Sequence, residues 1–325
     1  MKTRPDCIPC FLRQAQDTAR LCGSPPEILT ALDAELSARF RDYDPNTTPA
    51  ELSVMVYDLV AEHTGCPDPY ARVRSESVTK ALAFYPELKQ QVQNSEAPLL
   101  AALRLAIIGN LIDYGILSES EIESRLHKLL ARTAGAARTA GAARVAGAGK
   151  PADPLFFAFP SFRRDLEKAQ TLLYLGDNAG ETVFDRVLME TIRERWPDKR
   201  ITFAVRGKAI INDALEEDAR ASGIAETADI VSSGSPAAGT VLSLCSSEFR
   251  SRFRGADLVI SKGQGNFEAL SAERGPIYFL LVAKCAMIAR HVGCSQGSFL
   301  LLPAGWQAAA NGPSPSPQVR LSEKQ

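Results

Sequence analysis

Polar and glycine-rich segments follow the apolar runs in the second half of the chain. Asp177 and Asn178 come directly after the run 171–175, Asp213 comes a few residues after the run 201–205, and Lys262 follows the run 257–261. Carboxylate and amide oxygens are the ligands that Mg²⁺ or Mn²⁺ prefers. Glycines that lead into a helix present backbone N–H groups to an anion, and a lysine is a compact cation for a phosphate. The pattern therefore indicates a metal-and-phosphate site.

Each of these residues also has an ordinary structural explanation. Asp177 and Asn178 can cap a helix that starts near Gly180. Asp213 can be a solvated acid in the first turn of a helix, and Lys262 a surface lysine. Two well-known phosphate motifs are absent: Glu268 occupies the place of the last glycine in the dinucleotide fingerprint, and no GxxxxGK[ST] loop occurs.

The elements that must position these residues alternate between strands and helices. Strand-like runs begin at residues 171, 201, 229, 257 and 277, and the first four start 30, 28 and 28 residues apart. Helical stretches are predicted between them at 181–196, 209–223 and 239–253. This alternation predicts an α/β fold with a mainly parallel, doubly wound sheet that is covered on both faces. Ligands bind at the carboxyl ends of the strands in such sheets, where the polar segments lie.

The first part of the chain has helical periodicity and no β-alternation. Helices are predicted at 9–23, 25–40, 48–65, 70–85, 97–115 and 120–132, with Thr48 as a candidate cap. The domain prediction is a helical domain at 1–132, an Ala/Gly-rich flexible linker or insertion at 133–152, an α/β domain at 153–302 and a disordered tail at 303–325.

Composition excludes several classes of protein. The chain has 325 residues, 37 Lys+Arg against 38 Asp+Glu, three histidines and seven dispersed cysteines. The balanced charge argues against a nucleic-acid partner, and no apolar stretch is long enough for a membrane helix. The odd cysteine count does not indicate a disulfide framework, and the few histidines disfavour a multi-histidine zinc site. We expect a cytoplasmic protein with neither nucleic-acid nor membrane partners.

Cys7 and Cys10 form a CxxC pair at the start of the first predicted helix. This spacing suits a second, soft metal or a redox pair. A zinc site normally needs two further ligands, and no second CxxC is present. The alternative is that both thiols are buried against the helical core, since free cysteines are commonly buried.

Several motifs together resemble one known family. GDNAGE (176–181), RGKAIINDA (206–214) and SKGQGNFE (261–268) resemble those of the metal-dependent damage-control phosphatases, formerly a domain of unknown function. DCIPCFLRQA (6–15) and AIIGNLIDYG (106–115) in the helical half are similar as well. Their order matches the stand-alone prokaryotic branch. The resemblance implies a helical N-terminal domain packed on a Rossmann-like α/β domain, and it covers about residues 1–130 and 155–300.

The resemblance also implies roles for individual residues. Asp177, Asn178 and Asp213 would bind one divalent metal ion (Mn²⁺, Mg²⁺, Co²⁺ or Ni²⁺) and act in catalysis together with Lys262, which would contact the substrate phosphate. Further residues expected around the substrate are Glu181, Arg206, Gly263, Asn266 and Glu268. Asn110 and Asp113 can reach the site from the helical domain, or they can form a helix-end turn before Gly115.

The activity that the resemblance implies is hydrolysis of small phosphate monoesters, such as sugar phosphates or related damaged or excess phosphometabolites. Two alternatives are an S-adenosylmethionine-dependent carboxyl methyltransferase, because the family has also been linked with that reaction, and a non-catalytic nucleotide- or metabolite-binding protein. The sequence leaves the physiological substrate, the preferred metal and the oligomeric state open.

Overall fold

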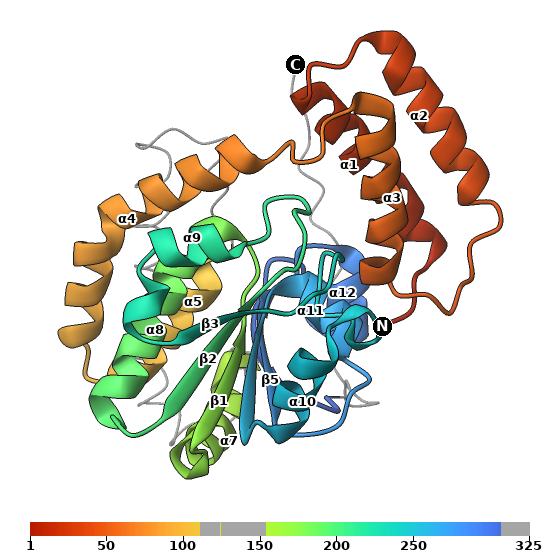
Figure 1. The fold of residues 1–325 in the computed structure, drawn as a ribbon. Helices are drawn as coiled ribbons and strands as arrows, with labels where there is room; N and C mark the ends of the chain where they lie inside the picture. The colour runs from red at the N-terminus through yellow and green to blue at the C-terminus, as the bar shows by residue number, and fades with distance from the viewer. Residues whose placement is uncertain (111–123, 125–153, 307–325) are drawn as a thin grey trace, which may run out of the picture.

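A six-stranded sheet organises the molecule (Figure 1). The computed structural model describes residues 1–110, 124 and 154–306. The strand order is β3-β2-β1-β4-β5-β6. Strands β1 to β5 are parallel, and β6 runs antiparallel to β5 at one edge. The carboxyl ends of the five parallel strands therefore meet at one edge of the sheet.

The five predicted strands are confirmed. They are β1 (Thr171–Leu175), β2 (Arg200–Val205), β3 (Asp229–Ser232), β4 (Leu258–Lys262) and β5 (Ile277–Val282). The sequence analysis missed β6 (Phe299–Pro303), an apolar run that pairs with β5 so that Phe279 lies opposite Leu302. Pro303 thus belongs to the sheet, whereas residues 307–325 of the predicted tail lie outside the described residues.

Helices cover both faces of the sheet, as the predicted fold class requires. One face packs against α5 (Pro98–Gly109), α7 (Pro154–Lys168) and α8 (Thr182–Arg195), and the other against α10 (Ser247–Gly255), α11 (Gly263–Leu270) and α12 (Ala286–Val292). Alternate residues of β1 serve the two cores: Leu172 and Tyr174 face the first, Leu173 and Leu175 the second. None of the described helices combines the length and hydropathy needed to cross a membrane.

Two predicted helices are shorter than expected. The described helix within the stretch 209–223 is the short α9 (Glu216–Ala221). The 3₁₀ turn η3 (Ile224–Glu226) comes directly after this stretch. Before α9 the chain makes a turn at residues 211–212, and Asp213 then forms a β-bridge with Asn178 in place of a helical turn. The stretch 239–253 contains the 3₁₀ turn η4 (Leu242–Leu244) and the first part of α10, because Thr240 is fixed by hydrogen bonds to Asn266.

The N-terminal helices pack in two different ways. The turn η1 (Pro5–Cys7) leads into α1 (Ile8–Leu21), α2 (Pro26–Arg39) and α3 (Pro49–Thr64), which bury their own core around Phe11, Leu36 and Val56. We call α1–α3 the cap. In contrast, α4 (Ala71–Gln93) and α5 share the core of the sheet face that α8 covers. The predicted domain limits near 132 and 152 stay predictions, because residues 125–153 lie outside the described residues.

Thr48 begins α3 with a complete capping box. The Glu51 backbone N–H donates to the Thr48 hydroxyl at 3.2 Å, and the Thr48 backbone N–H donates to the Glu51 carboxylate at 2.7 Å. Both donors would otherwise lack an intrahelical partner. The candidate cap residue is therefore confirmed.

We expect Thr48→Ala to lower the free energy of unfolding by about 1 kcal/mol. Urea denaturation followed by circular dichroism measures this loss. The control is Thr30→Ala on the exposed side of α2, where the hydroxyl only donates to the Pro26 carbonyl of the same helix. Equal stability of the Thr48→Ala and wild-type proteins would show that the capping box contributes nothing.

Candidate active site

A cavity of about 820 Å³ lies between the cap and the carboxyl edge of the sheet. The cap supplies one wall through residues of η1, α1 and α3, and the strand-end segments supply the other. The polar residues on this second wall include Asp177, Asn178, Asp213, Gln264, Glu268 and Lys284, with Asn110 at the end of α5. The sheet edge predicted to hold a site is therefore the edge where the cavity lies.

Asp177, Asn178 and Asp213 come together because the segments after β1 and β2 pair with each other. Asn178 and Asp213 form an antiparallel β-bridge, and the Ala214 N–H donates to the Asp177 carbonyl at 2.7 Å. All three side chains line the cavity. The structural alternatives for these residues are wrong. Asn178 precedes the turn η2 (Ala179–Glu181) without making a capping hydrogen bond, and Asp213 is only 1% exposed.

Asn110 joins two of the predicted site segments. Its Nδ2 donates to Asp177 Oδ2 at 2.8 Å and also to Glu181 Oε1, which accepts a second hydrogen bond from Asn178 Nδ2 at 2.5 Å. Asn110 Oδ1 is buried and has no hydrogen-bond partner within the described part of the chain. Asn110 thus reaches the site from α5, whereas Asp113 lies outside the described residues.

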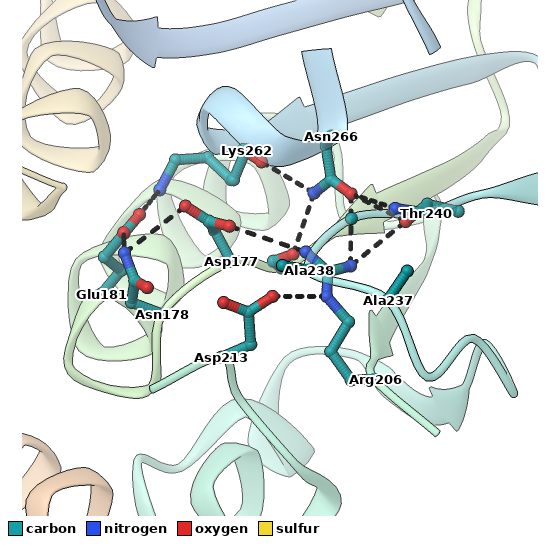
Figure 2. A network of polar contacts seen from close by, with 12 residues as sticks. Asp177, Asn178, Glu181, Arg206, Asp213, Ala237, Ala238, Thr240, Lys262 and Asn266 are labelled. Atoms are coloured by element: carbon teal, nitrogen blue, oxygen red, sulfur yellow. Dashed lines mark hydrogen bonds and ion pairs between the residues drawn. The ribbon is translucent and has the colours of Figure 1, made fainter. Parts of the chain in front are cut away.

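Arg206 and Asn266 lie behind the cavity wall (Figure 2). Arg206 Nε donates to Asp213 Oδ2 at 2.6 Å, and its guanidinium lies 3.5 Å from Asp177 Oδ1. Asn266 accepts from Thr240 and Arg206 and donates to the carbonyls of Gly176 and Lys262. Both residues are buried and hold the strand ends together.

Lys262 is buried rather than exposed at the surface. Its Nζ donates to Glu181 Oε2 at 3.0 Å and to Asp185 Oδ1 at 2.5 Å, and its side chain is 0% exposed. Asp185 Oδ1 also accepts from the Tyr174 hydroxyl at 2.7 Å. Lys262 therefore neutralises carboxylates beneath the site in this arrangement, and its predicted contact with a phosphate stays a prediction.

Gly263 allows α11 to begin directly against the Asp177 carboxylate. Its φ is +79°, a conformation that side chains rarely adopt, and a Cβ at this position would fall 1.9 Å from Asp177 Oδ2. Any larger residue would displace either the helix or the carboxylate. Gly263 therefore fixes the distance between Asp177 and the first turn of α11.

The buried acids experience strong mutual repulsion. Burial, followed by the charges of Glu181 and Asp213, raises the pKa of Asp177 to about 8. Burial and the charge of Glu181 also raise the pKa of Asp213, although Arg206 opposes them. The pKa of Asp185 rises to about 6 through burial, against the effect of Lys262. The raised pKa values show that Arg206 does not offset the repulsion among these acids, and among the described residues nothing binds the buried Asn110 oxygen. Oxygen ligands with uncompensated negative charge fit a divalent cation.

Lys284 is a cavity residue that the sequence analysis missed. It follows β5, is exposed to the cavity, and its charge lowers the pKa values of both Asp177 and Asp213. The signal was present in the sequence, because 277–283 was predicted as a strand. The polar segments singled out in the sequence all follow the first four strands, whereas Lys284 follows the fifth.

Cys7 and Cys10 both line the cavity, and Cys285 joins them from the start of α12. Both residues of the pair are partly buried, and burial raises the pKa of Cys7. Within residues 1–110 and 154–306, no three His, Cys, Asp or Glu side chains are grouped so that they could hold a metal ion. The predicted soft-metal or redox role of Cys7 and Cys10 stays a prediction.

We expect Lys262→Met to lower the free energy of unfolding by about 3–5 kcal/mol, because it leaves two buried carboxylates without their cation. The control is Lys208→Met, which removes an ion pair to Asp58 whose side chains are about half exposed and should cost below about 1 kcal/mol. Chemical denaturation at neutral pH compares the two variants. Equal, small losses would show that Lys262 does not support the buried acids.

Comparisons with known proteins identify the family of the chain. The family model of the damage-control phosphatase ARMT1-like domain matches residues 3–300. A protein of Archaeoglobus fulgidus named damage-control phosphatase is 31% identical over 92% of this chain and 98% of its own length. The damage-control phosphatase PH1575 of Pyrococcus horikoshii is 29% identical over 93% of this chain and 98% of its own length.

The solved structures include a similar fold. The crystal structure of PH1575 from Pyrococcus horikoshii, described as a DUF89 family protein, superposes with a TM-score of 0.77 at 28% sequence identity. The match covers 94% of this chain and 99% of that chain. Because the family model spans nearly the whole sequence and the site motifs converge on one cavity, the chain belongs to the damage-control phosphatase ARMT1-like domain family.

Proposed function

We propose that the protein is a divalent-metal-dependent phosphatase that hydrolyses small phosphate monoesters. The relatives named damage-control phosphatases support a phosphatase role for the chain. The observation that carries the proposal is the convergence of Asp177, Asn178 and Asp213 at one end of a cavity that also holds Lys284. Hard oxygen ligands beside a cation are what a metal-assisted phosphoryl transfer needs.

Asp177, Asn178 and Asp213 would hold the metal through their side-chain oxygens. The raised pKa values of the two aspartates support this role, because a bound cation would offset the repulsion that causes them. When bound, such an ion supplies Lewis-acid polarisation of a phosphoryl oxygen and activates water. The identity of the metal is left to experiment among Mn²⁺, Mg²⁺, Co²⁺ and Ni²⁺.

Other residues orient and balance these ligands. Asn110 and Glu181 fix the Asp177 and Asn178 side chains by hydrogen bonds, and Lys262 balances the charge of Glu181 from below. Lys284 is the lysine on the cavity wall, so we propose that it meets the phosphate. Hydrolysis adds water across the ester bond: the water oxygen bonds to phosphorus, and the alcohol leaves with a proton.

The rest of the cavity fits a small polar substrate. Gln14, Ser53 and Tyr57 of the cap face the strand-end segments across it. Amide and hydroxyl groups of this kind bind substrate hydroxyl groups. This lining supports sugar phosphates or related metabolites as the substrate class.

We expect Asp177→Asn to lower metal-dependent phosphate release by at least about 100-fold, because one anionic ligand is lost. Metal affinity, measured by titration calorimetry, should fall in parallel. The metal-free variant should unfold no more easily than the wild type, since the substitution relieves repulsion from Glu181 and Asp213. The control is Asp58→Asn, at an exposed ion pair with Lys208.

Three outcomes would contradict the proposal. Full activity of Asp177→Asn would exclude Asp177 as a ligand. Metal and ester binding by the wild type without any phosphate release would favour a non-catalytic binding protein, and methyl transfer from S-adenosylmethionine would favour a methyltransferase.

We expect Lys284→Met to lower kcat/KM for a phosphate ester by about 10- to 100-fold, because a hydrogen bond from a charged donor to the phosphate is lost. Its stability should match the wild type, since Lys284 is exposed. Steady-state kinetics with Lys208→Met as the control measures the effect. An unchanged kcat/KM would exclude Lys284 and leave Lys262 as the candidate phosphate contact.

A further inference from the structure

Glu268 is a carboxyl group on the cavity wall that the proposed metal site does not use. It lies on α11, whose first residue Gly263 abuts the Asp177 carboxylate. Glu268 comes five residues after Gly263 in this helix, a rise of about 7.5 Å along the helix axis. Gln264 and Glu268 line the same cavity, one helical turn apart. Glu268 therefore opens onto the same cavity as Asp177, Asn178 and Asp213, from a later turn of the helix that begins against the Asp177 carboxylate.

Glu268 differs from the other acids of the cavity in its partners. Asp177 and Asp213 face Arg206, and Asp6 pairs with Arg290 at 3.0 Å. The Glu268 carboxylate instead accepts a hydrogen bond at 2.8 Å from Nε2 of the neutral Gln264. A carboxyl group without a paired cation keeps its proton more readily than an ion-paired one.

The surroundings of Glu268 determine its protonation. Burial raises its pKa to about 7, and the hydrogen bond from Gln264 and the Met1 ammonium oppose this only in part. Cys7 of η1 is near enough to interact with it, while Lys284 and Arg290 line the same cavity. His291 of α12 packs against the Phe267 ring next to it. Near neutral pH the group is therefore available in its acid form.

We propose that Glu268 is the general acid that protonates the leaving alcohol. This inference rests on the proposed phosphatase function. As the water oxygen bonds to phosphorus, the P–O bond to the alcohol breaks, and the electron pair of that bond stays on the alcohol oxygen. The Glu268 carboxyl gives its proton to that oxygen and becomes a carboxylate. The attacking water releases one proton to solvent, and Glu268 regains one from solvent, so protons balance over the cycle.

The test compares esters with different leaving groups. A general acid matters for an alkyl phosphate, whose alcohol is a poor leaving group, and much less for p-nitrophenyl phosphate, whose phenolate leaves without a proton. We expect Glu268→Gln to lower kcat/KM for glycerol 3-phosphate by about 100-fold or more and to change that for p-nitrophenyl phosphate by less than about 5-fold. The control is Glu273→Gln, the same exchange at an exposed position just after α11.

The pH dependence gives a second readout. In the wild type at saturating metal, kcat/KM for the alkyl ester should fall as pH rises through about 7, since Glu268 then loses its proton. This decrease of kcat/KM, the alkaline limb of the pH profile, should be absent with p-nitrophenyl phosphate. It should also be absent with either ester in Glu268→Gln. The comparison of the two esters with the wild-type enzyme requires no variant, so it tests the role of Glu268 even if Glu268→Gln does not fold.

Two results separate the hypotheses. Equal losses for both esters in Glu268→Gln, or the same pH limb for both esters in the wild type, would overturn the role of Glu268. Absence of phosphate release from either ester by the metal-loaded wild type would overturn the proposed function instead. Metal titration of Glu268→Gln should give the wild-type affinity, because Glu268 is not among the proposed ligands.

Discussion

The site depends on an excess of buried negative charge. Four carboxylates (Asp177, Glu181, Asp185 and Asp213) are buried at the carboxyl edge of the sheet, and the buried cations that pair with them among the described residues are Arg206 and Lys262. Burial of unpaired charge is costly, so every carboxylate needs hydrogen bonds or a cation. The two cations lie beneath the site, and the remaining negative charge therefore faces the cavity. A cation is thus attracted to this end of the cavity.

The sequence predicted where the acidic residues lie. It did not predict which buried cations pair with them. Asp177, Asn178 and Asp213 could be predicted as site residues because parallel strands end at one edge of a sheet, and this holds however the helices pack. The burial of Lys262 could have been inferred from strand alternation. Leu258 and Ile260 face the core that α8 covers, and Lys262, two residues further, shares that face. The three-dimensional structure is needed, however, to show that Asp185 of α8 lies on that face and pairs with Lys262.

Asn110 and the cavity walls depend on contacts between distant segments, which local patterns do not reveal. Asn110 lies 67 residues from Asp177 in sequence, and it reaches the carboxylate because α5 packs closely on α8. Gly109 permits this approach, since a Cβ there would fall 3.0 Å from the Phe184 ring. A sequence search can mark Asn110 as polar, but it cannot measure how near the two helices lie. The edge strand β6 departs from the regular pattern in a different way, because it pairs antiparallel with β5, whereas the strand–helix alternation predicts parallel strands.

The cap is joined to the sheet largely through small residues. Ala50 of α3 packs on Ala237 and Val241, the Ala238 N–H donates to the Ser53 hydroxyl, and Gly239 lies between Ala50 and the Gly265 carbonyl. The cap also has a core of its own. The cap residues that line the cavity can therefore diverge during evolution while the buried carboxylates at the sheet edge remain unchanged. Paralogues of one such scaffold can in this way acquire different metabolite preferences and retain a shared reaction.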